Sequence, residues 1–260
     1  SYGETSSDIF GNVFALKKNG NGKTKILIDA HIDIIGLMVT EIHDDGILSF
    51  ACVGGVDTRI LPSMRVVIHG KENVKGVIGV PPPHLLKGDE SEPYKVENLT
   101  IDTGYTKEEI SRIVETGDLI SFDSGFTKLL NGRISAGGLD NKLGVYCALK
   151  SLEKINREDA EIVVAATCGE EINLNGARIA GNLSEFDLCI VIDVTHGTTP
   201  DSKEELTFEL GKGPSVALGP GLSKKHNDGI ISYAKQHNIP FSYEVTSGRT
   251  GTNANAYNIN

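Results

Sequence analysis

Two adjacent carboxylates, Glu170 and Glu171, follow an apolar run of the chain. The run, residues 162–167, ends at Cys168-Gly169 and is typical of a buried strand in a parallel sheet. Such sheets place their chemistry just beyond the carboxyl ends of their strands. Two carboxylates in one partly dry site need a proton or a cation between them, so the pair indicates either a raised pKa or a metal ion. Taken alone, the pair also fits a solvated loop.

Three further element ends carry side chains of the same kind. Residues 25–30 predict a strand, and His31 and Asp33 follow it on one side of an extended backbone. A carboxylate this close to an imidazole commonly orients a metal-binding histidine. Asp140 opens a helical pattern, and Asp193 ends another apolar run. The ordinary alternatives are a chance His-x-Asp pair and, for Asp140, a helix N-cap.

Together these residues form a set that can bind metal ions. The four that strand or helix ends can deliver to one sheet edge are His31, Asp140, Glu171 and Asp193. A set rich in oxygen ligands, with one histidine and no cysteine, suits divalent zinc, cobalt or manganese. Glu170 is then left over beside a ligand, where a general base for metal-activated water would stand.

The composition argues against several classes of function. The chain has 260 residues and a formal net charge of −10, which argues against a nucleic-acid partner. No apolar run approaches the ~20 residues of a membrane span, and no charged-then-apolar leader opens the chain. We therefore expect a cytoplasmic protein with no membrane partner. The four cysteines lack metal-type or disulfide-type spacing, which favours buried reduced thiols.

The order of predicted elements indicates an α/β fold with an insertion. Residues 1–54 and 134–260 alternate strands with helices, which predicts a catalytic domain with a mixed, mostly parallel sheet and helices on both faces. Residues 55–133 show short β runs and frequent turns, which predicts an inserted β-rich domain. Before this insertion, Asp44-Asp45-Gly46 separates two apolar runs and predicts a hairpin.

Five ordered motifs give the sequence a family resemblance. They are His31-Ile-Asp-Ile-Ile-Gly-Leu-Met-Val, Leu139-Asp-Asn-Lys-Leu-Gly-Val, Cys168-Gly-Glu-Glu-Ile-Asn-Leu-Asn-Gly-Ala, Ile192-Asp-Val-Thr-His and Leu210-Gly-Lys-Gly-Pro. Together they resemble the TET-type dinuclear zinc aminopeptidases, whose members are also labelled glutamyl aminopeptidase, deblocking aminopeptidase or cellulase. The resemblance covers nearly the whole chain and implies the zinc-peptidase type of fold.

The resemblance implies a role for each candidate residue. The implied metal ligands are His31 and Asp193 in one site, Glu171 in the other, and Asp140 as a bridge between two divalent ions. The implied catalytic residues are Glu170, as general base, and Asp33, as support for the histidine. The β-rich insertion resembles the family's oligomerisation domain. This implies a homo-oligomer, for which relatives offer hollow tetrahedral particles of twelve subunits, a dodecamer, as the precedent.

The sequence departs from the family pattern at three places. The bridging aspartate is followed by Asn141-Lys142 instead of an aspartate and an arginine. The family's Gly-Thr-Asp segment reads Gly251-Thr252-Asn253, which we expect to alter substrate contacts. The second site's histidine belongs to an Arg-Tyr-x-His stretch that would lie beyond Asn260. Because the chain also starts at Ser1, we expect the natural protein to extend past both ends. These residues alone would then hold one metal ion or none, whereas the full-length subunit would hold two.

These features favour a metal-dependent aminopeptidase that removes N-terminal residues from peptides. One alternative is a catalytically incomplete scaffold or paralogue that lacks the second metal site. Another is a glycosidase that uses Glu170 and a second acid without metal, as the cellulase label suggests. The glycosidase is disfavoured, because adjacent glutamates cannot easily flank a sugar bond with carboxyl groups ~5–9 Å apart.

Overall fold

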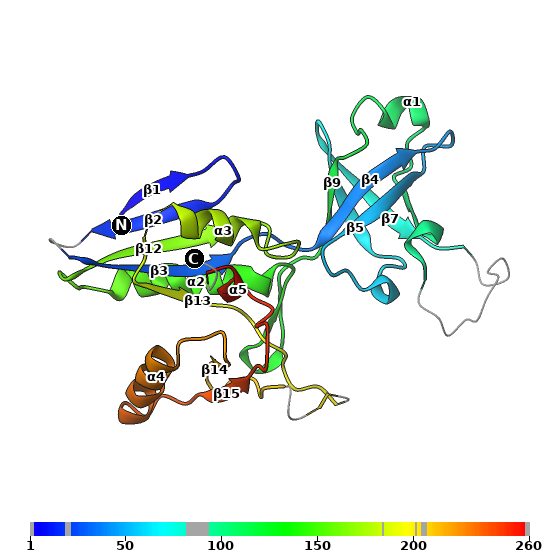
Figure 1. The fold of residues 1–260 in the computed structure, drawn as a ribbon. Helices are drawn as coiled ribbons and strands as arrows, with labels where there is room; N and C mark the ends of the chain where they lie inside the picture. Colours follow the sequence, from blue (N-terminus) through cyan, green and yellow to red (C-terminus); the bar gives the residue numbers. More distant parts are fainter. Residues whose placement is uncertain are drawn as a thin grey trace. The chain divides into compact units, whose positions relative to one another are not determined.

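A computed structural model describes residues 3–18, 22–81, 94–183, 185–200, 202–203 and 207–257 of the chain (Figure 1). The chain divides into two compact units. The first, named the sheet unit here, comprises Ser1–Asp33 and Asp140–Asn260. The second, named the barrel unit, comprises Ile34–Leu139.

A five-stranded sheet forms the frame of the sheet unit. Its strands, in spatial order, are β1 (Glu4–Ser7), β2 (Val13–Lys18), β12 (Ala160–Thr167), β3 (Thr24–His31) and β13 (Leu188–Val191). β3 pairs in parallel with β12 and β13, whereas β2 pairs antiparallel with β1 and β12. The sheet is therefore mixed, as expected. The further expectation that it is mostly parallel is not confirmed, because the hairpin of β1 and β2 contributes two antiparallel pairings.

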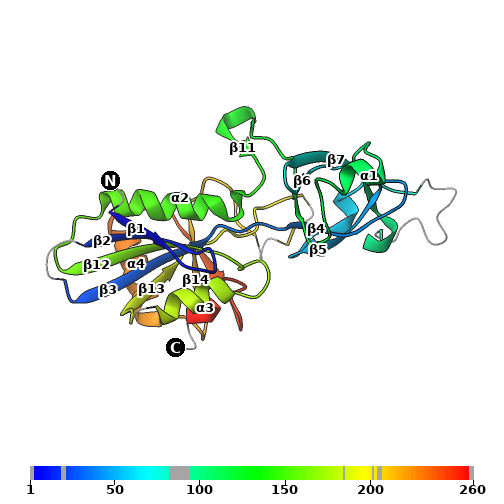
Figure 2. The ribbon, with the colours of Figure 1, turned by 90° about the horizontal axis from the view of Figure 1, so that it is seen from above.

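Helices cover both faces of this sheet (Figure 2). α2 (Leu139–Lys154) lies on one face, and α3 (Asn175–Asn182) lies on the other with α5 (Ala254–Tyr257) beside it. α2 packs because its pattern is amphipathic: Ala148 and Leu152 are buried against Ile28, Ile162 and Val164 of the sheet. The helix thereby fixes where its first turn, which contains Asp140, lies relative to the strand ends.

The C-terminal part of the sheet unit adds a βαβ element. β14 (Ser215–Leu218) and β15 (Ser242–Val245) form a parallel pair connected through α4 (Lys224–Gln236). The side chain of Asn227 in α4 donates a hydrogen bond to the carbonyl oxygen of Ala217 in β14, at 2.8 Å. Among the described residues, no helix has both the length and the apolar composition that crossing a membrane requires.

The barrel unit is a closed six-stranded barrel with a core of its own. Its strands, in spatial order, are β4 (Gly36–Ile42), β5 (Leu48–Val53), β8 (Thr100–Asp102), β7 (Asn73–Gly79), β6 (Arg65–His69) and β9 (Leu119–Phe122). Every strand contributes buried apolar residues, among them Leu48, Ile68 and Ile101. The other elements that the described residues of this unit form are η1 (Thr58–Ile60), η3 (Val96–Asn98), α1 (Lys107–Ile110), and the hairpin of β10 (Thr127–Lys128) and β11 (Ile134–Ser135) around η4 (Leu130–Gly132).

The barrel unit begins earlier in the chain than the expected insertion. Residues 55–133 all lie inside it, but so does the hairpin of β4 and β5, which the expected boundary left in the catalytic domain. The hairpin itself forms as predicted, with Gly46 at a φ of 85° in its turn. β4 pairs with β9 and β5 pairs with β8, so both strands close the barrel. A hairpin signal is local and does not reveal which sheet the hairpin joins.

The separate cores lead to a stability prediction. Ile68→Ala should lower the free energy of unfolding of the barrel unit by ~2–5 kcal/mol, because it leaves a cavity in a packed core. Leu152→Ala is the matched control in the sheet unit, where this leucine is equally buried. Peptide-resolved hydrogen exchange in urea should locate each loss of protection in one unit. Equal losses in both units for either variant would contradict the division.

Candidate metal and catalytic site

The candidate site lies where two parallel strands end. Thr167, the last residue of β12, pairs with His31, the last residue of β3. Beyond Thr167 the chain enters residues 168–174, named the glutamate loop here, which carries Glu170 and Glu171 and leads into α3. The parallel order of the strands thus delivers an imidazole and two carboxylates to the same edge of the sheet, as the sequence indicated.

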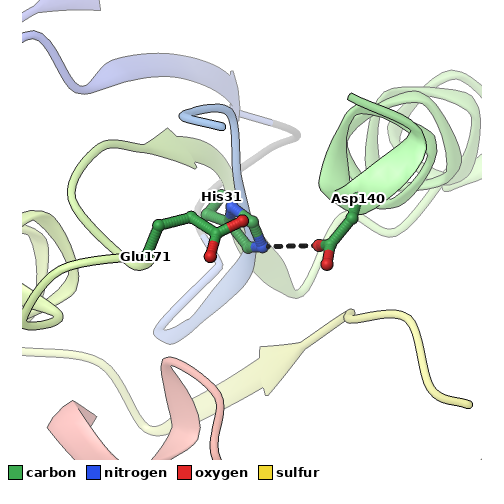
Figure 3. Close-up of side chains that lie close together, drawn as sticks. All are labelled: His31, Asp140 and Glu171. Atoms are coloured by element: carbon green, nitrogen blue, oxygen red, sulfur yellow. Dashed lines mark ion pairs between the residues drawn. The ribbon is translucent and has the colours of Figure 1, made fainter. Parts of the chain in front are cut away.

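Three of the four expected metal ligands surround the imidazole of the fourth, His31. Figure 3 shows Asp140, from the start of α2, and Glu171, from the glutamate loop, directed toward His31. The imidazole Nε2 lies 3.0 Å from Oδ1 of Asp140 and 3.6 Å from Oδ1 of Asp193. One ligand atom from each of His31, Asp140 and Glu171 lies within 4.8 Å of the other two. The strand and helix ends therefore converge in the structure.

The electrostatics of this cluster demand a cation. The His31 side chain is only 2% exposed, and burial alone would lower its pKa. The nearby carboxylates of Asp193 and Asp33 outweigh burial and raise the pKa of His31 to about 11. The carboxylates therefore favour a positive charge at this place, which a proton or a divalent ion can supply. One imidazole with three carboxylates is a donor set that fits zinc, cobalt or manganese.

Asp33 joins the histidine to the glutamate loop. Its carboxylate accepts the backbone N–H groups of Glu170, at 3.1 Å, and Glu171, at 3.3 Å. Nδ1 of His31 lies 3.2 Å from the carbonyl oxygen of Asp33 and 3.6 Å from its Oδ1. Burial raises the pKa of Asp33, but these bonds outweigh it and leave the pKa below its ordinary value. The sequence indicated the contact with the imidazole and missed the contact with the loop.

Glu170 is half-buried beside the expected ligands. Burial is the main cause that raises its pKa to about 7; the charge on His31 opposes this rise, and the carboxylates of Asp193 and Glu171 add to it. Burial, followed by the carboxylate of Asp140, also raises the pKa of Glu171. A carboxyl group that titrates near neutral pH can both accept and return a proton, which is the property that a general base needs.

Asn141 connects the two aspartates of the cluster. Its Nδ2 donates to the carbonyl oxygen of Ile192, at 2.8 Å, and its Oδ1 accepts the N–H of Gly144, at 3.0 Å. The bond therefore joins the residue after Asp140 to the residue before Asp193. The side chain is fully buried, and an aspartate here could accept from Gly144 but could not donate to a carbonyl. Asn141 thus has a structural role that the sequence alone did not reveal.

Asn253 anchors the C-terminal segment to the strand ends. Its Nδ2 donates to Oδ2 of Asp29 and to Oγ1 of Thr167, both at 2.8 Å, and the Thr167 hydroxyl donates to Oδ1 of Asp29 at 2.8 Å. The side chain of Asn253 is 2% exposed, so the expectation that it contacts substrate is not confirmed. We missed Asp29 in the sequence, although an acid inside the apolar run of β3 is itself the signal of a buried polar partner.

A double-mutant cycle tests this network. Asn253→Asp should destabilise the sheet unit by about 2–4 kcal/mol at neutral pH, because a second carboxylate replaces the donor that faces buried Asp29. Adding Asp29→Asn exchanges donor and acceptor and should restore most of the loss. Chemical denaturation of the four proteins measures the coupling, and simple additivity of the two substitutions would contradict a direct pair.

Comparisons with known proteins identify the family of this chain. The model of the M42 glutamyl aminopeptidase family matches residues 11–260. The lysyl aminopeptidase of Pyrococcus furiosus is 33% identical over 99% of this chain and 75% of its own length. The structure of a TET aminopeptidase from a marine sediment archaeon of the Thaumarchaeota covers 100% of this chain and 76% of its own, with a TM-score of 0.91 and 29% identity.

A further solved relative concerns assembly. The Pyrococcus horikoshii TET1 peptidase, described as assembling into a tetrahedron or a large octahedral shell, covers 97% of this chain and 77% of its own, with a TM-score of 0.82 and 30% identity. The family match spans nearly the whole chain and includes every residue of the cluster around His31. This chain belongs to the M42 glutamyl aminopeptidase family.

Proposed function

We propose that this chain is a metal-dependent aminopeptidase whose catalytic centre is the cluster around His31. Membership of the family makes it a peptide hydrolase. The observation that carries the location of the centre is the buried imidazole of His31, which faces the carboxylates of Asp140 and Asp193 and groups with Glu171. Its substrates are peptides with a free N-terminus, from which it removes N-terminal residues.

The proposed cofactors are two divalent ions per subunit of the full-length protein, with zinc as the first choice and cobalt or manganese as alternatives. His31, Asp140 and Asp193 would hold one ion, and three protein ligands are the usual number in a catalytic zinc site. Asp140 would also bind the second ion, together with Glu171. When bound, such ions lower the pKa of water and polarise a carbonyl group.

The chain's own residues divide the remaining work. Glu170 accepts the proton of the attacking water and returns it to the leaving amine, for which a pKa of about 7 is suited. Asp33 holds the backbone N–H groups of Glu170 and Glu171 and contacts Nδ1 of His31, so one carboxylate orients both the base and the imidazole. Asp33 therefore acts by positioning other groups, without transferring a proton.

The proposed setting is a homo-oligomer in the cytoplasm. The TET1 peptidase of P. horikoshii can assemble into a tetrahedron or a large octahedral shell, and a tetrahedral dodecamer is the form that we propose for the full-length protein. The barrel unit would serve this assembly, because a barrel with its own core can present contacts without disturbing the sheet that holds the site. The formal charge of −10 supports the absence of a nucleic-acid partner.

Two other functions remain as outcomes of the tests. An incomplete paralogue would bind no metal at the cluster and release no amino acid. A glycosidase is disfavoured, since Glu170 and Glu171 are adjacent residues held by the same carboxylate and cannot easily flank a sugar bond with carboxyl groups ~5–9 Å apart. Assays of the full-length protein on peptides and on a glucan, with and without a chelator, separate these cases.

The role of Glu170 leads to the first functional prediction. Glu170→Gln should lower kcat at least ~10²-fold, because the amide cannot accept the proton, while the bound metal and the fold stay unchanged. Glu158→Gln, at an exposed glutamate of the same unit, is the matched control and should keep wild-type turnover. Peptide hydrolysis and metal analysis by mass spectrometry are the measurements. Wild-type turnover by a fully loaded Glu170→Gln variant would refute the base.

The proposed role of Asp140 as a ligand of both ions leads to the second functional prediction. Asp140→Ala should lose both ions, because this side chain would contact each of them, and should lose activity with them. Asp159→Ala, which removes an exposed carboxylate paired with Arg157, should keep both. Metal content after dialysis and reloading with zinc is the readout. Two ions per subunit in the Asp140→Ala variant would exclude the bridge.

A further inference from the structure

Asn12 is a fully buried asparagine that has no part in the proposed catalytic chemistry. It stands directly before β2, whose first residue, Val13, pairs with Ala166 near the end of β12. This register brings Asn12 alongside the point where the glutamate loop begins. The buried amide of Asn12 therefore lies at the base of the loop that carries Glu170 and Glu171.

Asn12 bridges the two ends of the glutamate loop. Its Oδ1 accepts the backbone N–H of Cys168 at 2.8 Å, and its Nδ2 donates to the carbonyl oxygen of Gly176 at 3.0 Å. Gly176 in turn donates its N–H to the carbonyl oxygen of Cys168, at 3.0 Å. The side chain thus completes the pairing between the residue that opens the loop and the second residue of α3.

The packing around this bridge leaves no space for a side chain at position 176. A Cβ atom on Gly176 would lie 2.0 Å from the carbonyl oxygen of Cys168 and 2.6 Å from Oδ1 of Asn12. The backbone strands of the loop approach each other that closely only because residue 176 is a glycine. The amide of Asn12 then links Cys168 and Gly176 a second time, beside their backbone hydrogen bond.

The carboxylate of Asp8 holds the side-chain amide of Asn12 in its orientation. Asp8 accepts Nδ2 of Asn12 at 2.8 Å through Oδ2, and its Oδ1 accepts the N–H groups of Asn12, at 3.0 Å, and Phe10, at 2.9 Å. Both hydrogens of the amide are therefore used, which fixes the oxygen toward Cys168. The same turn places the Phe10 ring against Gly169, within 3.5 Å of where a Cβ atom on that glycine would stand.

We propose that Asn12 is a positioning residue for the proposed general base: through Cys168 and Gly176 it holds the glutamate loop so that Glu170 and Glu171 face His31. The inference depends on the proposed function. Asp33 accepts the backbone N–H groups of the two glutamates, and Asn12 joins Cys168 to Gly176 at the base of the loop. Loss of the Asn12 side chain would leave the N–H of Cys168 without this acceptor, and a shift of about 1 Å at a catalytic group can cost ~10²-fold in rate.

The test compares Asn12→Ala with a matched control in the full-length protein. Asn12→Ala should lower kcat ~10- to 10²-fold with little change in KM, because the loop is displaced while the substrate contacts remain. Hydrogen exchange of peptides from residues 168–176 should accelerate in both the metal-free and the zinc-loaded protein. Asn227→Ala removes a similar asparagine–carbonyl bond elsewhere in the sheet unit and should change neither quantity.

A second variant keeps the test informative if Asn12→Ala folds poorly. Asp8→Asn alone keeps the Asn12 acceptor for the N–H of Cys168 and the Asn12 donor to Gly176, and removes the carboxylate that accepts the other amide hydrogen and orients the amide. Its kcat should lie between those of Asn12→Ala and the wild type.

Three results would overturn the role of Asn12. They are wild-type kcat in folded Asn12→Ala, wild-type exchange of residues 168–176 in that variant, and an effect confined to KM. Failure of the proposed function is a separate result: a fully active Glu170→Gln protein would remove the base, while the exchange rates would still decide whether Asn12 orders the loop.

Discussion

The structure depends on holding several negative charges around one buried imidazole. Asp33, Asp140, Glu171 and Asp193 all approach His31, and Glu170 lies close enough to raise its pKa further. Carboxylates a few Å apart in a partly dry site repel one another by several kcal/mol. A positive charge among them stabilises the cluster, and each element that carries an acid must be fixed in place. A proton on His31 or a divalent ion meets the first requirement, and the surrounding fold meets the second.

Neutral amide side chains fix the elements that carry the acids. Among the described residues, the buried polar side chains are Asn12, Asp29, His31, Asn141, Thr167 and Asn253, and all of them lie in the sheet unit. Each asparagine joins segments that end in the cluster: the glutamate loop, the pair of α2 and β13, or β3 with β12. An amide donates and accepts at once without adding charge, so it can satisfy buried backbone groups beside a cluster of carboxylates where another acid would add to the repulsion.

The sequence predicted the residues of the cluster and missed the residues that hold it. Each acid follows an apolar run or opens a helical pattern, and parallel strands bring such ends to one edge, so their convergence could be expected. The extent of the barrel unit could not, because the pattern of β4 and β5 is equally compatible with either sheet. The structural roles of the buried asparagines could not be predicted for a different reason. Asn12 contacts Gly176 from far along the chain, and a buried amide has no sequence pattern that distinguishes it from the surface asparagines that are more common.

Two asparagines stand where the family resemblance leads us to expect aspartates, and each of them faces a hydrogen-bond acceptor. At position 253 the side chain faces Asp29, a carboxylate that is fully buried and whose pKa burial raises to about 6. Two carboxylates at this place would have to share a proton, whereas the amide donates to Asp29 and to Thr167 together. At position 141 the amide donates to a carbonyl that a carboxylate would repel. Both departures therefore preserve the geometry of the site, and the neutral side chains follow from the acceptors that face them.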